Sequence, residues 1–304
     1  MSSVSTTKGT LIEGLGIEAA MDRFDLLVLG AFHQDPKNVQ HTRRHIINNW
    51  RDDNKYKSLG LSSSQGFEQI SPDEEDRAVK NLVDYWFEPY FLPTMNIGQL
   101  RDYFLAFEDI YNLELTCDIN MAGEKPLVID AFHHYAGFSA LFSLYKFFVT
   151  ELGYKRILIL NGKKNTDPRL ELVGTLISRL TGCEYGNVLM EKNWWIELGK
   201  QVNETTVVFY MGDMPPLLFT DTHKKSKTSS EISLYTQSGD RFSFEGFSVS
   251  KFITRRIKAH HISITLPEEK TLHICEWEGR TKFDCPVYEW IYWPALFRLY
   301  TQFY

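Results

Sequence analysis

Cysteine is scarce in this chain, and its spacing excludes the frameworks that cysteines usually build. The 304 residues include four cysteines, at positions 117, 183, 275 and 285, and no two of them form a CxxC pair. Neither a zinc site nor a disulfide framework is therefore expected, and the thiols favour a reducing compartment. No histidine pair at i, i+4 spacing is accompanied by a carboxylate, so we also expect no metal.

Long uncharged apolar runs are absent as well. The longest apolar stretch, 138–149, is interrupted by Ser143 and Lys146 and is too short to span a bilayer, which takes about 20 residues. The first residues lack a basic segment followed by an apolar core. The sequence therefore predicts neither a transmembrane helix nor a signal peptide.

The chain has no excess of basic residues. Its net charge of −6 gives no overall attraction to nucleic acid, so no nucleic-acid partner is expected. Aromatic residues, in contrast, are abundant and gather at 84–93, 193–195 and 288–304. We expect most of these rings in the core; the alternative is an acyl-chain pocket or a lipid-facing surface.

The N-terminal part is predicted to be helical after a short disordered start. Residues 1–10 are rich in Ser and Thr and show no apolar period, which is typical of disorder. Ser71 has the character of an N-cap, because Pro72 and three acidic residues follow it in the first turn. Three helices are expected, over 41–54, from Ser71 to the prolines at 89 and 93, and from Asn96 onward.

From Pro126 onward, apolar strands alternate with helices. The first strands are LVIDA (127–131), RILIL (156–160) and TTVVFYM (205–211). This alternation predicts an α/β fold with a mainly parallel central sheet flanked by helices, placed after the N-terminal helical region. Helices are expected over 139–153, 167–182 and 194–202.

The last third of the chain is predicted to continue the sheet. A late β-hairpin turns at 238–240, further strands cover 261–266 and 271–278, and Pro286 is expected to open a C-terminal helix. No long linker divides the chain. We therefore expect one domain, 11–304, with a helical part (11–120) and a sheet core (121–304).

Polar segments follow the predicted strands. AFHHYAG follows 127–131, NGKKNTD follows 156–160, GDMPP follows 205–211, and the end of HISITLPEE is the fourth such segment. Because ligands of open α/β sheets bind outside the carboxyl ends of the strands, these segments predict a site there. A histidine in this place suits a general base, and the alternative is a histidine that caps the next helix. The candidate residues are His133, His134, Lys163, Lys164, Asn165, Asp167 and Asp213.

The order of these segments resembles the lauroyl/myristoyl acyltransferases of lipid A biosynthesis, within the glycerolipid acyltransferase superfamily. The resemblance covers roughly residues 40–275. It rests on RRHIINNW, SPDEEDRAVKNLVDYWFEPYF, PLVIDAFHHYAG, KKNTDPRLELVGTLISRLTG and VVFYMGDMPP, and on FSFEGF followed by RRIKAHHISITLP. The resemblance implies a bacterial, cytoplasmic acyltransferase, for which peripheral contact with a membrane is one option. It implies an acyl-coenzyme A or acyl-carrier-protein thioester as the acyl donor, and no further cofactor.

The resemblance also implies roles for individual residues. The family's H-x4-D/E motif pairs a histidine base with a carboxylate, but here His134 is followed at that spacing by Ser139. A serine can orient an imidazole but cannot stabilise its charged form. Asp130 and Asp213 both remain open as replacements for the missing carboxylate. Substrate contacts are expected from His133, Gly137, Lys164 and Asn165.

Two further functions remain open. In a serine hydrolase, Ser139 or Ser143 would act as nucleophile with His134, although no G-x-S-x-G elbow is present. In a binding protein, the acyltransferase fold would keep its pocket without catalysis, which the serine in place of the carboxylate favours. The basic clusters KKSK (224–227) and TRRIK (254–258) are expected to be solvated faces, with anion contacts as the alternative.

Overall fold

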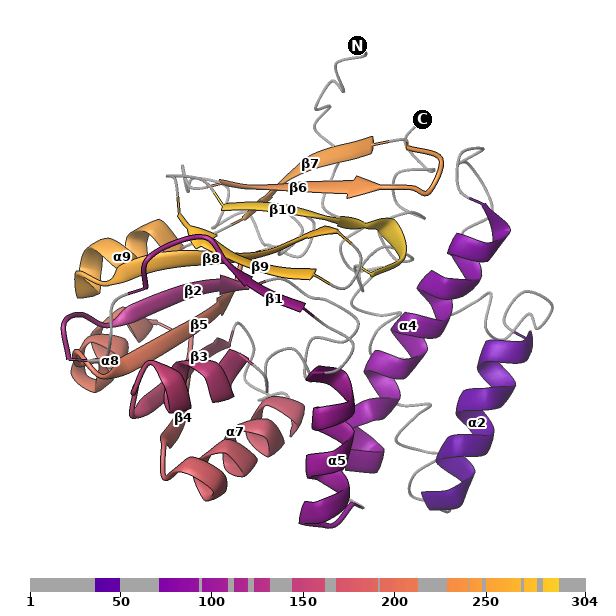
Figure 1. Ribbon diagram of the computed structural model, residues 1–304, viewed down its shortest axis with the longest axis horizontal. Coiled ribbons are helices and arrows are strands. Elements are labelled where there is room, and N and C mark those ends of the chain that lie inside the picture. The colour runs from indigo at the N-terminus through magenta and orange to yellow at the C-terminus, as the bar shows by residue number, and fades with distance from the viewer. Residues whose placement is uncertain are drawn as a thin grey trace.

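The structure, a computed structural model, describes residues 36–49, 71–92, 95–108, 112–119, 123–131, 144–161, 168–190, 192–212, 229–239, 241–247, 250–268, 271–277 and 281–289 (Figure 1). A seven-stranded sheet in the order β1-β9-β8-β2-β5-β3-β4 forms the centre. Its strands are β1 (Asn112–Leu115), β2 (Leu127–Ala131), β3 (Arg156–Asn161), β4 (Glu184–Leu189), β5 (Thr206–Met211), β8 (His260–Glu268) and β9 (Thr271–Glu276).

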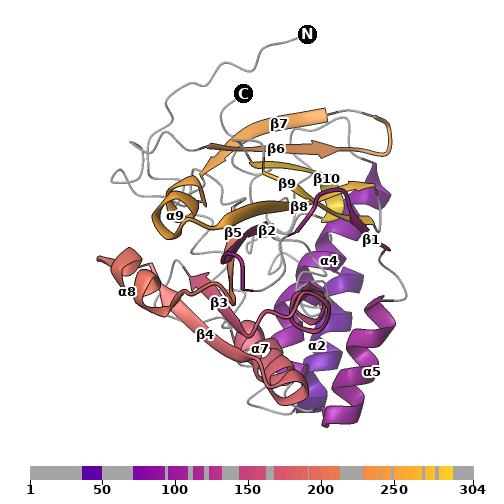
Figure 2. The same ribbon diagram turned by 60° about the vertical axis from the view of Figure 1, so that its left-hand side comes forward.

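The predicted α/β fold with a mainly parallel central sheet is confirmed. Strands β8, β2, β5, β3 and β4 run parallel to one another, β1 runs parallel to β9, and β8 and β9 form the antiparallel pair of the central sheet as described. The late hairpin is also present, as β6 (Ser229–Tyr235) and β7 (Arg241–Phe247). With β10 (Thr281–Pro286) it forms a second sheet that packs beside β8 (Figure 2).

Two of the three N-terminal helices described begin with a capping box. The three helices are α2 (Pro36–Asn49), α4 (Pro72–Phe91) and α5 (Ile97–Glu108). Ser71 caps α4 as predicted: the Glu74 backbone N–H donates to Ser71 Oγ at 3.2 Å, and the Ser71 backbone N–H donates to Glu74 Oε2 at 3.1 Å. Glu74 Oε1 also accepts from the Gln237 backbone N–H at 2.7 Å, which ties the start of α4 to the β6–β7 turn.

Several elements differ from the prediction. Helix α4 continues through Pro89, because a proline near the end of a helix removes one hydrogen bond while its φ stays helical. Pro286 ends β10 and leads into the 3₁₀ turn η5 (Val287–Glu289), and the rest of the predicted C-terminal helix lies outside the described residues. The edge strands β1 and β4 were not predicted from sequence, and β1 lies within the part expected to be helical.

Helices cover both faces of the central sheet. On one face, α8 (Trp194–Gln201) and α9 (Ser250–Ile257) insert Leu198 and Ile253 against Val128 and Val208. On the other face, Phe209 packs edge-on against Tyr145, with ring centroids 4.5 Å apart, just before the π-helical turn η2 (Phe147–Glu151). Strands β2 and β5 are therefore buried on both faces, mostly against apolar side chains, as a doubly covered parallel sheet requires.

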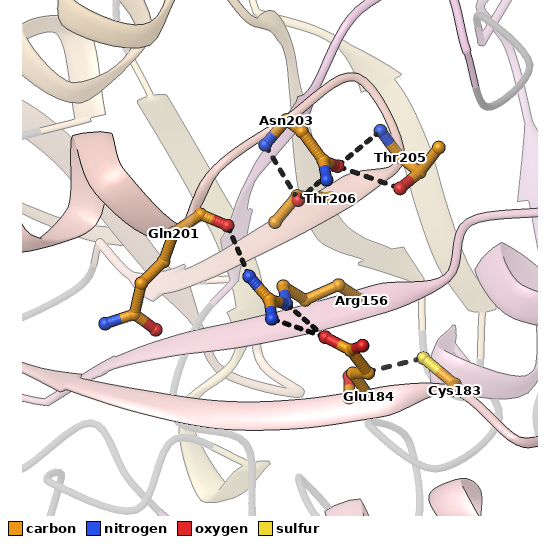
Figure 3. A network of polar contacts seen from close by, with 7 residues as sticks. All are labelled: Arg156, Cys183, Glu184, Gln201, Asn203, Thr205 and Thr206. Atoms are coloured by element: carbon orange, nitrogen blue, oxygen red, sulfur yellow. Dashed lines mark hydrogen bonds and ion pairs between the residues drawn. The ribbon is translucent and has the colours of Figure 1, made fainter.

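A polar network fixes the amino ends of the neighbouring strands (Figure 3). Arg156, the first residue of β3, pairs with Glu184, the first residue of β4, and donates from Nη1 to the Gln201 carbonyl at the end of α8 at 2.8 Å. Asn203 Oδ1 accepts from the Thr205 backbone N–H at 2.9 Å in the turn before β5. These contacts set the register in which β3, β4 and β5 begin.

Gly174 lies where α7 (Pro168–Thr181) packs closely on β4, so a substitution there can test this contact. A methyl group there would lie 2.1 Å from a Tyr185 ring carbon, whereas Gly199 in α8 has nothing within 4 Å of the corresponding position. We expect Gly174→Ala to lower the free energy of unfolding by about 1–3 kcal/mol because it overpacks this contact. The control Gly199→Ala should raise it by up to about 1 kcal/mol. Urea unfolding of the two variants measures this, and equal stability would contradict the packing.

Candidate functional site

The carboxyl ends of β2 and β5 lie side by side. Ala131, the last residue of β2, is in register with Met211, the last residue of β5. Beyond that pair, the Gly212 backbone N–H donates to the Ala131 carbonyl at 2.9 Å, so the two chains are still hydrogen-bonded where they leave the sheet. The segments that begin at residues 132 and 213 therefore start from adjacent points.

The third predicted segment starts from the same edge. Strand β3 is the other neighbour of β5, with Ile159 in register with Phe209, and it ends at Asn161. The predicted convergence of these strand ends is thus present in the described residues. The residues His133, His134, Gly137, Ser139, Lys163, Lys164, Asn165, Asp167 and Asp213 lie outside the described residues, and their roles remain predictions.

Asp130 is the predicted site residue that the structure describes, and it is buried in a polar pair. Its carboxyl group has no solvent exposure, and its Oδ2 lies 3.3 Å from Nε2 of His261 on the neighbouring strand β8. An ionised carboxylate only accepts hydrogen bonds, so with Asp130 ionised the Nε2 atom of His261 is the donor in this contact. The pair links β2 to β8 one residue before β2 ends.

The His261 ring is held on a second side by Trp277. The two rings stack with centroids 4.4 Å apart and planes 21° apart, and the Trp277 backbone N–H donates to the His261 carbonyl at 3.1 Å. His261 and Ser263 are only 6% and 4% exposed. Among the residues that the structure describes, His261 Nδ1 and Ser263 Oγ have no hydrogen-bond partner.

Strand geometry explains how these groups meet. Val128 is in register with His261, and Asp130 with Ser263, so all four side chains project to the same face of the sheet. The sequence does indicate that His261 and Ser263 share one face of their strand, since they are two residues apart. It does not show that β8 pairs with β2, and the Asp130–His261 pair was therefore missed. Because the pair is closed to solvent, its geometry suits a positioning role.

The preceding residue, His260, lies at the start of β8. Burial lowers its pKa below the ordinary 6.5, and Lys125 and His261 lower it further, while Glu276 opposes them. His260 is thus held in its neutral form more strongly in the folded protein than in the unfolded chain.

In the described ranges, no three His, Cys, Asp or Glu side chains are grouped as metal ligands. None of the helices described there has both the length and the apolar character needed to cross a bilayer. Two comparisons with known proteins give no match. No protein-family model matches this chain, and a search of curated proteins finds no significant match.

Removing the His261 imidazole tests the buried pair. We expect His261→Ala to lower the free energy of unfolding by about 3–5 kcal/mol, because it leaves a buried carboxyl group without this donor and opens a gap beside Trp277. His41→Ala, on the exposed side of α2, should stay within about 0.5 kcal/mol of the wild type. Denaturant titration measures both, and a small effect at His261 would show that the pair contributes little.

The lowered pKa of His260 predicts a dependence of stability on pH. Protonation favours the unfolded chain, whose histidine has the higher pKa, so stability falls as the pH drops below 6.5 and the loss is complete only below the folded pKa. His260→Gln should reduce the decrease in melting temperature between about pH 8 and about pH 5. An unchanged decrease in thermal melts of this variant would rule out His260 as its source.

Proposed function

We propose that this chain is an acyltransferase. It moves an acyl or aminoacyl group from a coenzyme A or carrier-protein thioester to a hydroxyl or amine acceptor, with His134 as general base. The observation that carries the proposal is the adjacency of the β2 and β5 ends, where Gly212 N–H still bonds the Ala131 carbonyl at 2.9 Å. The chains that lead to His134 and to Asp213 start from that hydrogen bond.

Asp213 is the better of the two replacement carboxylates in this proposal. Asp130 is fully buried and bonded to His261 on the face covered by α8 and α9. Asp213 follows directly after Gly212 at the edge where the polar segments begin. A carboxylate in that place supplies the charge that Ser139 cannot, and Ser139 then orients the imidazole by a hydrogen bond.

The proposed reaction needs one proton transfer in each direction. His134 takes the proton from the acceptor hydroxyl or amine as its oxygen or nitrogen forms a bond to the thioester carbonyl carbon. The C–S bond then breaks, and the His134 imidazolium returns the proton to the leaving thiolate. Lys164 and Asn165, which follow β3 in the sequence, would contact the donor or the acceptor together with His133 and Gly137.

A non-catalytic thioester-binding protein is the second candidate. One observation favours it: the His261–Asp130 pair engages the carboxyl group nearest to the histidines in sequence. If Asp213 does not serve His134, the motif H-x4-S lacks a charge partner, and the site would hold a thioester without transferring its acyl group. The thiol-release experiment described next distinguishes the acyltransferase from the binding protein.

The test is thiol release from a panel of acyl-coenzyme A and acyl-carrier-protein thioesters. Because general-base catalysis contributes roughly 10²–10⁴-fold, we expect His134→Ala to lower the rate by about that factor. Asp213→Asn should lower it severely with the fold intact, whereas the exposed-surface variant His41→Ala should keep the wild-type rate.

Three other results would reject the proposal. Full activity in His134→Ala would exclude this base. A stable acyl adduct on the protein, seen by intact-mass measurement, would favour the serine nucleophile instead. A donor that raises the melting temperature without any thiol release would establish the binding protein.

A further inference from the structure

A basic and aromatic surface lies on α8 and α9, away from the β2–β5 edge residues. We define the α8–α9 patch as Trp194, Trp195, Phe252, Arg255 and Arg256. Phe252, Arg255 and Arg256 are spaced i, i+3 and i+4 on α9, so they occupy one side of that helix, and all three are exposed. Phe252 alone leaves 46% of its surface in solvent.

Ring contacts join the two helices into one surface. The Trp194 ring meets the Phe252 ring edge-on, with centroids 6.0 Å apart. The Arg256 guanidinium lies over the Trp195 ring, 4.7 Å from its centroid, in a cation–π contact. Behind the patch, Leu198 of α8 and Ile253 of α9 are buried in the sheet core. The patch is therefore held in place by the fold before any partner arrives.

The charge of the patch is opposite to that of the chain. Helix α9 has the sequence SKFITRRI, which contains three basic residues and no acidic residue, in a chain whose net charge is −6. On α8 the acidic Glu197 is an ion-pair partner of Lys200, with Oε2 and Nζ 3.4 Å apart. Positive charge is thus in local excess beside the exposed Phe252 ring.

We propose that the α8–α9 patch docks the protein on an anionic membrane surface. Two arginines would meet lipid phosphate and carboxylate groups, while Phe252 would enter the boundary between headgroups and acyl chains. Tryptophans beside the arginines suit the same boundary, because an indole has an apolar body and one N–H donor. An acidic protein would satisfy the arginines equally well. The exposed Phe252 between cations favours the lipid surface.

This docking is independent of the proposed acyl transfer. Both views place α8 and α9 on one side of the molecule and α2 and α5 on the other (Figures 1 and 2). The exposed arginines Arg44 of α2 and Arg101 of α5 therefore lie far from the patch and offer a matched control. Changing two arginines to glutamates alters the net charge by the same amount at either place.

The experiment is co-sedimentation of the full chain with vesicles of phosphatidylcholine containing about 30% phosphatidylserine, or of phosphatidylcholine alone. The wild type should bind the anionic vesicles and release from them as salt rises from about 0.1 M to about 0.5 M. The double variant R255E/R256E should bind at least about 30-fold more weakly, since each arginine near an anionic surface contributes about fivefold and each new glutamate adds repulsion. The control R44E/R101E should bind like the wild type.

A second pair of variants tests the apolar contact. Phe252→Ala should weaken binding about tenfold at unchanged charge, whereas Leu180→Ala, at an equally exposed leucine of α7, should not. Far-ultraviolet circular dichroism shows that each variant remains folded. Failure of the wild type to bind anionic vesicles, equal weakening by both double variants, or binding to an acidic carrier protein but not to vesicles would each overturn the proposal.

Discussion

The parallel pairing of β2 with β5 is the constraint on which the rest of the structure depends. Both strands are buried on both faces, between the α8–α9 layer and the aromatic cluster of Tyr145 and Phe209. Their register runs from Leu127 and Val207 to Ala131 and Met211, so both chains leave the sheet at the same level. The two segments that follow these strands, from residues 132 and 213, therefore begin at fixed and adjacent positions.

A polar pair stands where this apolar core reaches its edge. Asp130 and His261 are buried in a region where an unpaired carboxyl group would be strongly destabilising, and the stacked Trp277 restricts the imidazole to one orientation. The pair thus connects β8, and through it the antiparallel edge strand β9, to the strand that leads to the histidines. It is a positioning device at the base of the candidate site, while the polar residues that follow the strands supply the proposed chemistry.

The elements that could be predicted from the sequence are those with a clear local pattern, such as an apolar run or a helix cap. Strands β2, β3 and β5 are continuous apolar runs, and α4 starts with a capping box, so sequence alone located them. Strand β4 reads EYGNVL, with one fully buried side chain, and its strand character comes from pairing with β3. The Asp130–His261 pair joins residues 131 positions apart, and no local pattern indicates which strands become neighbours. The contacts of Phe252 with Trp194 were hidden for the same reason.

The central claim is that His134 and Asp213 meet above the β2–β5 edge. Disulfide formation in the double variant H134C/D213C tests it directly, because a disulfide requires Cα atoms within about 7 Å. Under mild oxidation, intact-mass and peptide analysis should find these two cysteines linked, whereas the remote pair S71C/D213C should stay reduced. Absence of the 134–213 bond under conditions that oxidise other thiols of the chain would contradict the account.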